Sequence, residues 1–490
     1  MMVKATRRCA VLLGFVTAGM VVGSVPSFAE VQNVKVSGDV TARGFYRRNL
    51  DLHDEGSSNT ASFDTDHFFM STIGLNVAAD LTENVSAMLR LTNERDWNLT
   101  STSSSSEDIA LSQGYVTVKE LFYSPLTLRV GRQPIVWGRG FVLGSNLFPG
   151  VNGRGDDLHA AISANEFTDF TAFDAVRATL DLSGVAGLGT PLSLDYVYIK
   201  SDENSVADND DVNLQGANLG ARFESWNSEM ETYFLNKRDS SSGTSKNDND
   251  GSISTLGVRG SVQPVEGASV WGELAYQFGD EVTDPAGVLP AGKSHQAWAA
   301  NLAAEYTFAE IPTTPKVGVE WRYYSGKDLD GATAGWATIA PGYFTTVLRE
   351  FQTPRSVAGF YPNDQTFFSR LSGPTGAGTA SGTNQNEFAV YGSLKPIEDL
   401  TIAPRLSWFF LPVGAFPLGP PSFGEPSGSG QRTDKRKHYA GMEWDTIVTY
   451  DYTDDVQFGF IYALFAPGNV YRSPNDSTAQ EMISSVSVKF

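Results

Sequence analysis

The chain has 490 residues, a formal net charge of −20 and a single cysteine, Cys9. We do not expect so acidic a chain to bind nucleic acid, because a phosphate backbone attracts basic surfaces. One cysteine also excludes an intramolecular disulfide and a cysteine metal centre, and we expect neither a metal nor another cofactor.

The first 29 residues have the layout of a secretory signal peptide. A short basic segment precedes the uncharged apolar stretch 10–25, and Ser27 and Ala29 occupy the positions that a signal peptidase reads. No later apolar run approaches the ~20 residues of a transmembrane helix. We therefore expect residues 1–29 to be a signal peptide and residues 30–490 to form one exported domain. That domain is either soluble in the periplasm or crosses a membrane as strands.

The exported part alternates strand-like segments with gaps. In the first segment Val34, Val36 and Val40 share one face, and polar residues share the other, as the two-residue repeat of a strand requires. We predict eighteen strands, at 34–48, 66–80, 84–96, 109–120, 126–134, 171–182, 190–200, 211–225, 227–238, 252–264, 267–279, 294–308, 315–326, 384–396, 399–411, 436–451, 455–465 and 479–490.

The gaps between these strands alternate between short and long. The gap 397–398 is short, for example, whereas 97–108, 135–170 and 327–383 are long. Short periplasmic turns and long extracellular loops are typical of outer-membrane barrels. The sequence therefore predicts an all-β fold: a transmembrane antiparallel up-and-down β-barrel of about 18 strands, located in the bacterial outer membrane.

The C-terminal strand carries a second sign of export. Val486, Val488 and Phe490 alternate on one face, and the aromatic residue is the last one. This pattern looks like the closing-strand signal that the barrel-assembly machinery reads, so we assign Phe490 to that signal. The partners that we expect are this machinery, outer-membrane lipid and lipopolysaccharide.

Charged residues lie on the polar faces of many predicted strands. Arginine on the lipid-facing side of a barrel costs ~2–4 kcal/mol at mid-membrane, so these residues are expected to line the lumen. They either pair with one another and stiffen the wall, or they form a selectivity element for anions. The arginines are Arg43, Arg90, Arg129, Arg177, Arg222, Arg259, Arg322 and Arg405, and the acids are Asp39, Glu94, Asp181, Asp195, Glu231, Glu273, Glu305, Glu320, Glu443 and Asp445.

Two long loops are candidates for folding into or over the lumen. Loop 135–170 holds Trp137, Arg139 and Arg154, and apolar side chains are unusual in an exposed loop. A fold back into the barrel would bury them and narrow the pore, whereas an ordinary capped loop would not. Loop 327–383 is long enough for the same fold.

The segment Leu128–Gln133 with Trp137, then Phe173–Arg177 and Gly441–Asp445, resembles the alginate export family of outer-membrane channels. The resemblance implies an eighteen-stranded barrel that exports an anionic polyuronate through an arginine-lined lumen gated by inserted loops. Simple alternation points one of the matched residues, Arg132, outward unless a bulge re-aims it. The pore-wall candidates from the resemblance are Arg129, Arg132, Gln133, Arg177, Glu443 and Asp445, and the lumen pattern adds Arg322 and Arg405.

These features together favour passive passage or export of an anionic, carbohydrate-like solute, such as an alginate-type polyuronate, with periplasmic export partners compatible with that role. A general porin for small ions and nutrients is one alternative, and a barrel sheath around a periplasmic electron carrier is another. A barrel enzyme such as a lipase would need a Ser–His–acid set, and no such motif is evident, so we expect no enzyme.

Overall fold

The computed structural model describes residues 33–49, 65–97, 109–123, 125–145, 164, 167–184, 190–202, 212–239, 251–280, 294–326, 335–337, 339–340, 342–343, 345–348, 369–372, 378–381, 384–415, 437–471 and 476–490. The predicted signal peptide, 1–29, and Arg154 lie outside the described residues, and both assignments stay predictions.

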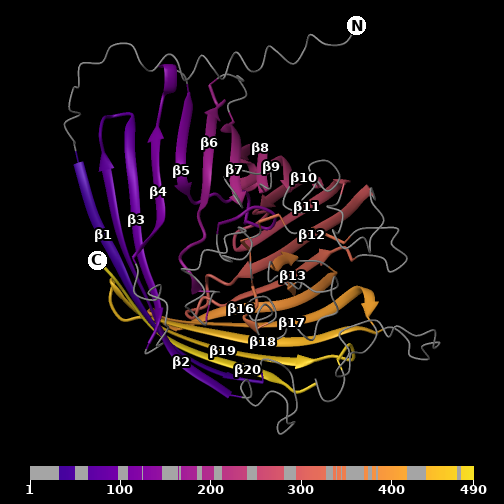
Figure 1. Ribbon diagram of the computed structural model, residues 1–490. Helices are drawn as coiled ribbons and strands as arrows, with labels where there is room; N and C mark the ends of the chain where they lie inside the picture. Colours follow the sequence, from indigo (N-terminus) through magenta and orange to yellow (C-terminus); the bar gives the residue numbers. More distant parts are fainter. Residues whose placement is uncertain are drawn as a thin grey trace.

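Strands make up nearly all of the regular structure in the described residues (Figure 1). They are β1 (Asn33–Arg48), β2 (Thr65–Asp80), β3 (Val85–Asp96), β4 (Ala110–Val118), β5 (Leu126–Gln133), β6 (Phe173–Asp181), β7 (Leu192–Asp202), β8 (Val212–Phe223), β9 (Ser228–Asp239), β10 (Gly251–Val262), β11 (Ala268–Asp280), β12 (Ser294–Thr307), β13 (Lys316–Tyr324), β14 (Ser369–Ser372), β15 (Gly378–Ser381), β16 (Gln385–Ile397), β17 (Leu400–Ala415), β18 (Lys437–Asp451), β19 (Val456–Pro467) and β20 (Ala479–Lys489). Two short 3₁₀ helices, η2 (Leu121–Tyr123) and η6 (Ser225–Asn227), lie in turns. None of the helices in the described residues has the length and hydropathy needed to span a membrane.

Eighteen of these strands form one closed antiparallel sheet, and β14 pairs only with β15. Each strand pairs with the next one along the chain, β13 with β16, and β20 pairs with both β19 and β1. The predicted fold class is confirmed, and each predicted strand overlaps an observed one. The largest boundary error is at β17, which continues to Ala415 rather than ending at 411.

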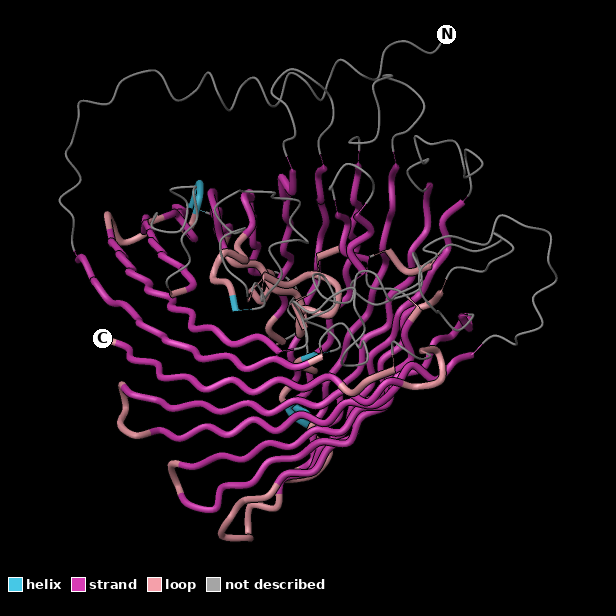
Figure 2. The backbone as a smooth tube through the Cα atoms, turned by 60° about the horizontal axis from the view of Figure 1, so that its bottom comes forward, coloured by secondary structure: helices cyan, strands magenta, loops and turns pink. Residues whose placement is uncertain are grey.

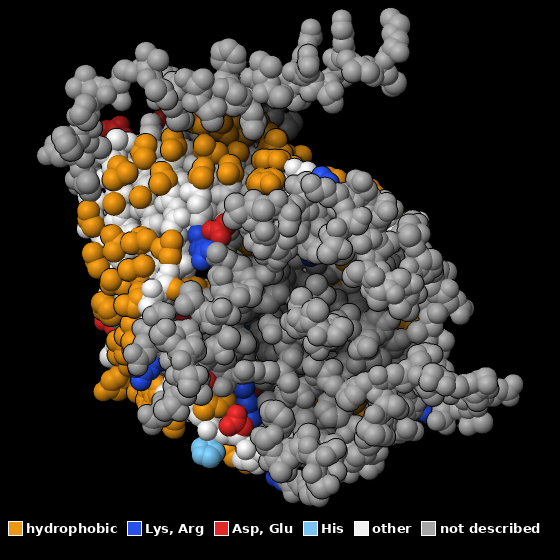
Figure 3. Space-filling model, in the orientation of Figure 1, with side chains coloured by type: hydrophobic (Ala, Val, Ile, Leu, Met, Phe, Trp, Pro, Cys, Tyr) orange, Lys and Arg blue, Asp and Glu red, His pale blue; other side chains and the backbone are white. Residues whose placement is uncertain are grey.

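The outer face of the barrel is apolar because one side of each strand carries the large hydrophobic side chains. Val36 and Val40 of β1 and Val317 and Val319 of β13 are all exposed on this face. In Figure 3 hydrophobic side chains cover most of the described wall on the left of the view. Aromatic pairs lie near both ends of the strands, as in the aromatic girdles of outer-membrane barrels, and examples are Phe69 with Trp97, Trp298 with Tyr323, Tyr306 with Phe308, and Tyr450 with Tyr452.

The seam of the barrel joins the two ends of the described chain. The backbone N–H of Gly38 donates to the Phe490 carbonyl at 2.8 Å, and the Phe490 N–H donates back at 2.9 Å. The Phe490 ring lies directly over Gly38, and a Cβ there would be 2.6 Å from the ring. Glycine is therefore needed at this point of β1 for the terminal aromatic ring to pack as it does.

Segments between the strands also lie inside the ring of strands (Figure 2). Residues 135–145 pack against the inner face of β6–β13 together with residues 336–340, and Leu143 forms a parallel bridge with Ala340. A second apolar cluster joins Ala164, Val347 and Leu348 to the inner face of β1, β2 and β17–β20. The interior of the barrel thus contains chain from both long loops.

Candidate functional site

The inner wall and the inserted segment 135–145 form the candidate site. The indole Nε1 of Trp137 donates to Asp195 Oδ2 at 2.8 Å, and the backbone N–H of Gly138 donates to Glu231 at 3.1 Å. The guanidinium of Arg139 lies 3.8 Å from the Trp271 ring centroid. Trp137 and Arg139, the described members of the predicted constriction loop, therefore contact the wall from inside the barrel.

Gly138 is the residue that lets this segment approach the wall so closely. Its φ of +58° is in the left-handed region, and a Cβ would lie 2.5 Å from Cδ of Arg259. Any other residue would be strained here and would push the segment away from β10.

Arg129 and Arg177 lie side by side on the inner wall, because they are direct partners in the β5–β6 ladder. The Nε of Arg177 donates to Asp195 at 2.9 Å, and its side chain is 26% exposed. The Nε of Arg129 donates to Thr117 Oγ1 at 3.2 Å, and the guanidinium lies 4.7 Å from the Tyr115 ring centroid. Among the described residues, no carboxylate lies within salt-bridge distance of Arg129. Asp195 thus contacts Arg177, and Arg129 lies beside this pair without a described carboxylate of its own.

The arginines on the opposite part of the wall are paired and buried. Arg322 of β13 is fully buried, and its Nη2 lies 2.7 Å from Glu387 of β16. Arg405 of β17 donates to both Glu387 and Glu320 at 2.9 Å. These four residues form the buried ion-pair cluster, in which two positive and two negative charges are in contact.

Glu443 and Asp445 of β18 extend this cluster. Asp445 is the ladder partner of Arg405, and Glu443 accepts the backbone N–H of Leu348 at 2.6 Å. Both carboxylates are buried. Gln133, another residue taken from the resemblance, is also buried and donates to the Ala175 carbonyl at 3.0 Å. Glu443 and Gln133 therefore hold neighbouring segments in place, and Asp445 lies buried in the wall beside Arg405.

Arg132 does not line the pore. It forms a ladder pair with Asp174 on the outer face, where its neighbour two residues earlier, Val130, is exposed. Although Gly131 has a φ of +122°, the β4–β5 and β5–β6 ladders continue through it without a register shift. The bulge that would have turned Arg132 inward is not present, so alternation decides its side and the resemblance-based expectation is corrected.

Among the acids of the inner wall that were not recognised in the sequence, Glu387 and Asp169 contact predicted arginines. Glu387 shares the inward face of β16 with Ala389, between the outward Phe388 and Val390, so alternation could have placed it. Asp169 belongs to a loop, and its carboxylate lies 2.6 Å from Nε of Arg90. No periodicity marks a loop residue as a partner for a strand residue 79 positions away. In the described part of the chain, no three His, Cys, Asp or Glu side chains are grouped to hold a metal ion.

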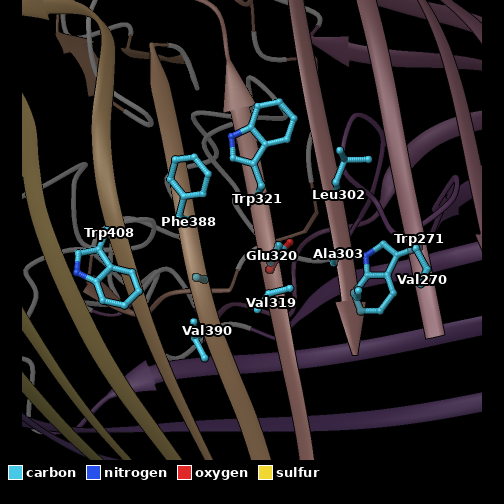
Figure 4. Close-up of a pocket in the computed structure, with 12 residues that line it drawn as sticks. Val270, Trp271, Leu302, Ala303, Val319, Glu320, Trp321, Phe388, Val390 and Trp408 are labelled. Atoms are coloured by element: carbon cyan, nitrogen blue, oxygen red, sulfur yellow. The ribbon is translucent and has the colours of Figure 1, made fainter. Parts of the chain in front are cut away.

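One cavity lies on the outer face of the wall, and a second lies inside the barrel. A groove of about 520 Å³ lies on the outer face of β11–β17, where Trp321, Phe388 and Trp408 surround it (Figure 4). Its lining is almost entirely apolar, and it faces lipid rather than solute. A polar cavity of about 630 Å³ lies between Arg139 and the β8–β9 and β10–β11 turns, at the periplasmic end of the lumen.

A closed antiparallel barrel with an apolar outer face and a charged inner wall defines an outer-membrane β-barrel, and the class of protein is an outer-membrane channel. The family model for alginate export matches residues 34–485. The chain belongs to the alginate export family and is a protein of the bacterial outer membrane.

Solved structures with a similar fold include outer-membrane proteins of pseudomonads. Pseudomonas aeruginosa OccK2 (OpdF), in complex with glucuronate, is 12% identical over 94% of this chain and 98% of its own, with a TM-score of 0.49. OccK8 (OprE) of the same organism is 11% identical over 94% and 98%, also at 0.49. Pseudomonas putida OprB is 9% identical over 93% and 94%, at 0.43. A comparison with curated protein sequences gave no match.

Proposed function

We propose that this channel passes anionic, carbohydrate-like solute across the outer membrane without catalysis, and that its substrate is an alginate-type polyuronate. We further propose that Arg129 and Arg177 form the surface that selects for anions. The observation that carries the proposal is their direct pairing on β5 and β6, where Asp195 contacts Arg177 and no described carboxylate contacts Arg129. A guanidinium binds a uronate carboxylate through two parallel hydrogen bonds, which a neutral sugar does not offer.

The wall around this pair supports the same assignment. Arg90, Arg259, Arg322 and Arg405 each contact two carboxylates and are at most 11% exposed, so they contribute little positive potential to the lumen. Among these inward-facing strand arginines, Arg129 and Arg177 therefore keep the most positive potential, with one described carboxylate between them. Charges are screened beyond ~8 Å at physiological salt, so only a solute that passes close to this pair responds to it.

The general porin is the second candidate function, and the ion pairs favour it. If most lumen charges are neutralised by contact, small ions of either sign can pass. The sheath around an electron carrier is less well supported, because residues 135–145 and the described residues 336, 339, 340, 347 and 348 occupy space that a carrier protein would need.

Planar-bilayer recordings test the proposal. Replacing Arg129 and Arg177 together by glutamine should shift the reversal potential towards cations, most strongly at low salt. Block of the ion current by an oligouronate should weaken about tenfold, since hydrogen bonds to a charged group are lost. A neutral oligosaccharide of the same length should be unaffected by the substitutions.

The matched control is the double variant R132Q with R238Q, which removes two arginines from the outer face. It should leave selectivity and block unchanged. Unaltered selectivity in a folded R129Q/R177Q variant would contradict the proposal and leave the general porin as the better assignment.

A further inference from the structure

The outer face of β5–β9 carries a row of charged and polar residues at the long-loop end of the strands. The ladders place Arg132 beside Asp174, Asp174 beside Lys200, Lys200 beside Asn213, and Asn213 beside Arg238. Because neighbouring strands lie 4.7–4.9 Å apart, each cation is about 10 Å from the next. Three basic residues and one acid thus form a continuous line, which we call the basic row.

The basic row lies directly above the lipid-facing surface. One step towards the membrane, the ladder row begins with Val130, Val176 and Tyr198, which are all exposed. One step further, Tyr196 and Phe234 are exposed on the same face. The first row below the basic row ends in the polar residues Gln215 and Asn236, and the second contains tyrosine and phenylalanine. The change from a charged row through a mixed row to an apolar and aromatic row is the profile expected where headgroups give way to hydrocarbon.

Arg132 is held in a fixed orientation at one end of this row. Its Nε and Nη2 donate to the two oxygens of Asp174 at 3.1 and 2.9 Å, and Nη1 donates to the Leu111 carbonyl at 3.0 Å. A guanidinium has five N–H donors, so two are not used by these bonds. At the centre of the row, the Tyr198 hydroxyl donates to Asn213 Oδ1 at 3.0 Å and fixes the surface below Lys200.

No such row is found among the described residues of β11, β12, β13, β16 and β17. Their outer positions near the long-loop end include the aromatic residues Tyr276, Phe278, Trp298, Tyr323, Phe388 and Phe410. Aromatic rings suit an interface with any lipid, whereas a line of cations suits an anionic headgroup. The charged side therefore differs from a general lipid-facing rim.

We infer that the basic row is a binding site for lipopolysaccharide and that it holds the phosphates of lipid A. The long-loop end of the strands faces the outer leaflet, which consists of lipopolysaccharide. Lipid A carries phosphates at both ends of a disaccharide, directly above its acyl chains, so phosphates and chains match the basic row and the apolar rows below it. Arginine and lysine are the residues that bind phosphate in proteins. The acyl chains lie against Val130, Val176 and the tyrosines.

The inference is tested by the double variant K200Q with R238Q. Folding is checked by heat-modifiable gel mobility, and binding of purified lipopolysaccharide is measured by thermophoresis in detergent. Loss of two cations at a membrane surface should weaken binding roughly 10- to 30-fold. Lipid A without its phosphates should bind the native protein no better than it binds the variant.

The matched control is R48Q with R95Q, which also removes two arginines from the outer face at the same end. Thr65 pairs with Arg48 and Ser71 with Arg95, six residues apart on β2, so this pair does not form a row. The control should bind lipopolysaccharide like the native protein. Equal binding by the folded K200Q/R238Q variant would overturn the inference. Equal competition by phosphatidylglycerol vesicles, or displacement by inorganic phosphate, would overturn the assignment to lipopolysaccharide.

Discussion

Two groups of arginines on the same inner wall have opposite surroundings. Of Arg129 and Arg177, on β5 and β6, Arg177 contacts one described carboxylate and Arg129 contacts none, and the side chain of Arg177 is partly exposed to the lumen. Arg322 and Arg405, on β13 and β17, are in contact with two carboxylates and are shielded from solvent. The first pair keeps positive potential available to a solute, whereas the second pair joins neighbouring strands.

The difference shows that the direction of a side chain and the availability of its charge are separate properties. Both pairs point inward by alternation, yet burial makes an ion pair costly to break and leaves little field outside it. An ion pair that is exposed to the lumen contributes little to stability, but its charges act strongly on passing ions. Stability and selectivity are therefore expected to respond to different substitutions.

The largest effect is expected in the buried ion-pair cluster. Replacing Arg322 by methionine leaves Glu387 and Glu320 without one of their two cations, and should lower the free energy of unfolding by about 3–5 kcal/mol. Urea titration of the barrel in phospholipid vesicles measures it. The control is R222Q on the inner face of β8, whose side chain is 77% exposed. It should change stability by less than ~0.5 kcal/mol. Similar losses in both variants would remove the distinction between the two groups.

An intermediate effect is expected at Asp195. The D195N variant removes the carboxylate that contacts Arg177 in the described part of the chain, so the reversal potential should shift towards anions, opposite to R129Q/R177Q. Stability should fall by about 1–3 kcal/mol, because Arg177, Thr179 and Trp137 all donate to this carboxylate. A shift towards cations in the bilayer would show that Asp195 does not set the potential at this pair.

The smallest effect is expected at Trp137. The W137F variant keeps an aromatic ring against Tyr233 but loses the indole N–H that reaches Asp195, which should lower stability by about 1 kcal/mol. W444F is the matched control, because Trp444 donates to Thr446 on the exposed outer face. It should have no measurable effect. If W444F destabilises the barrel as much as W137F does, the contact between the inserted segment and the wall is not specific.

Much of the fold could be predicted from the sequence, and less of the site. Alternation placed Arg129, Arg177, Arg322 and Arg405 on the inward face, and the structure puts them there. Alternation could not show how strongly each arginine is paired with carboxylates, because Glu387 and Asp195 reach these arginines through the ladder register of particular strand pairs. The resemblance proposed Arg132 for the pore wall, and the continuous ladder places it outside.

The sequence alone determined the number of barrel strands, their faces, and the alternation of short turns with long loops. Side chains alternate between the two faces of a strand, and the face that carries the large apolar residues is the one that meets lipid. Only the tertiary structure decided which arginines are neutralised and which segments enter the barrel. Leu348 meets Glu443 across 95 residues of chain, and Asp169 meets Arg90 across 79. Such contacts depend on how loops fold back onto a closed sheet, and the local residue periodicity of a segment carries no information about that folding.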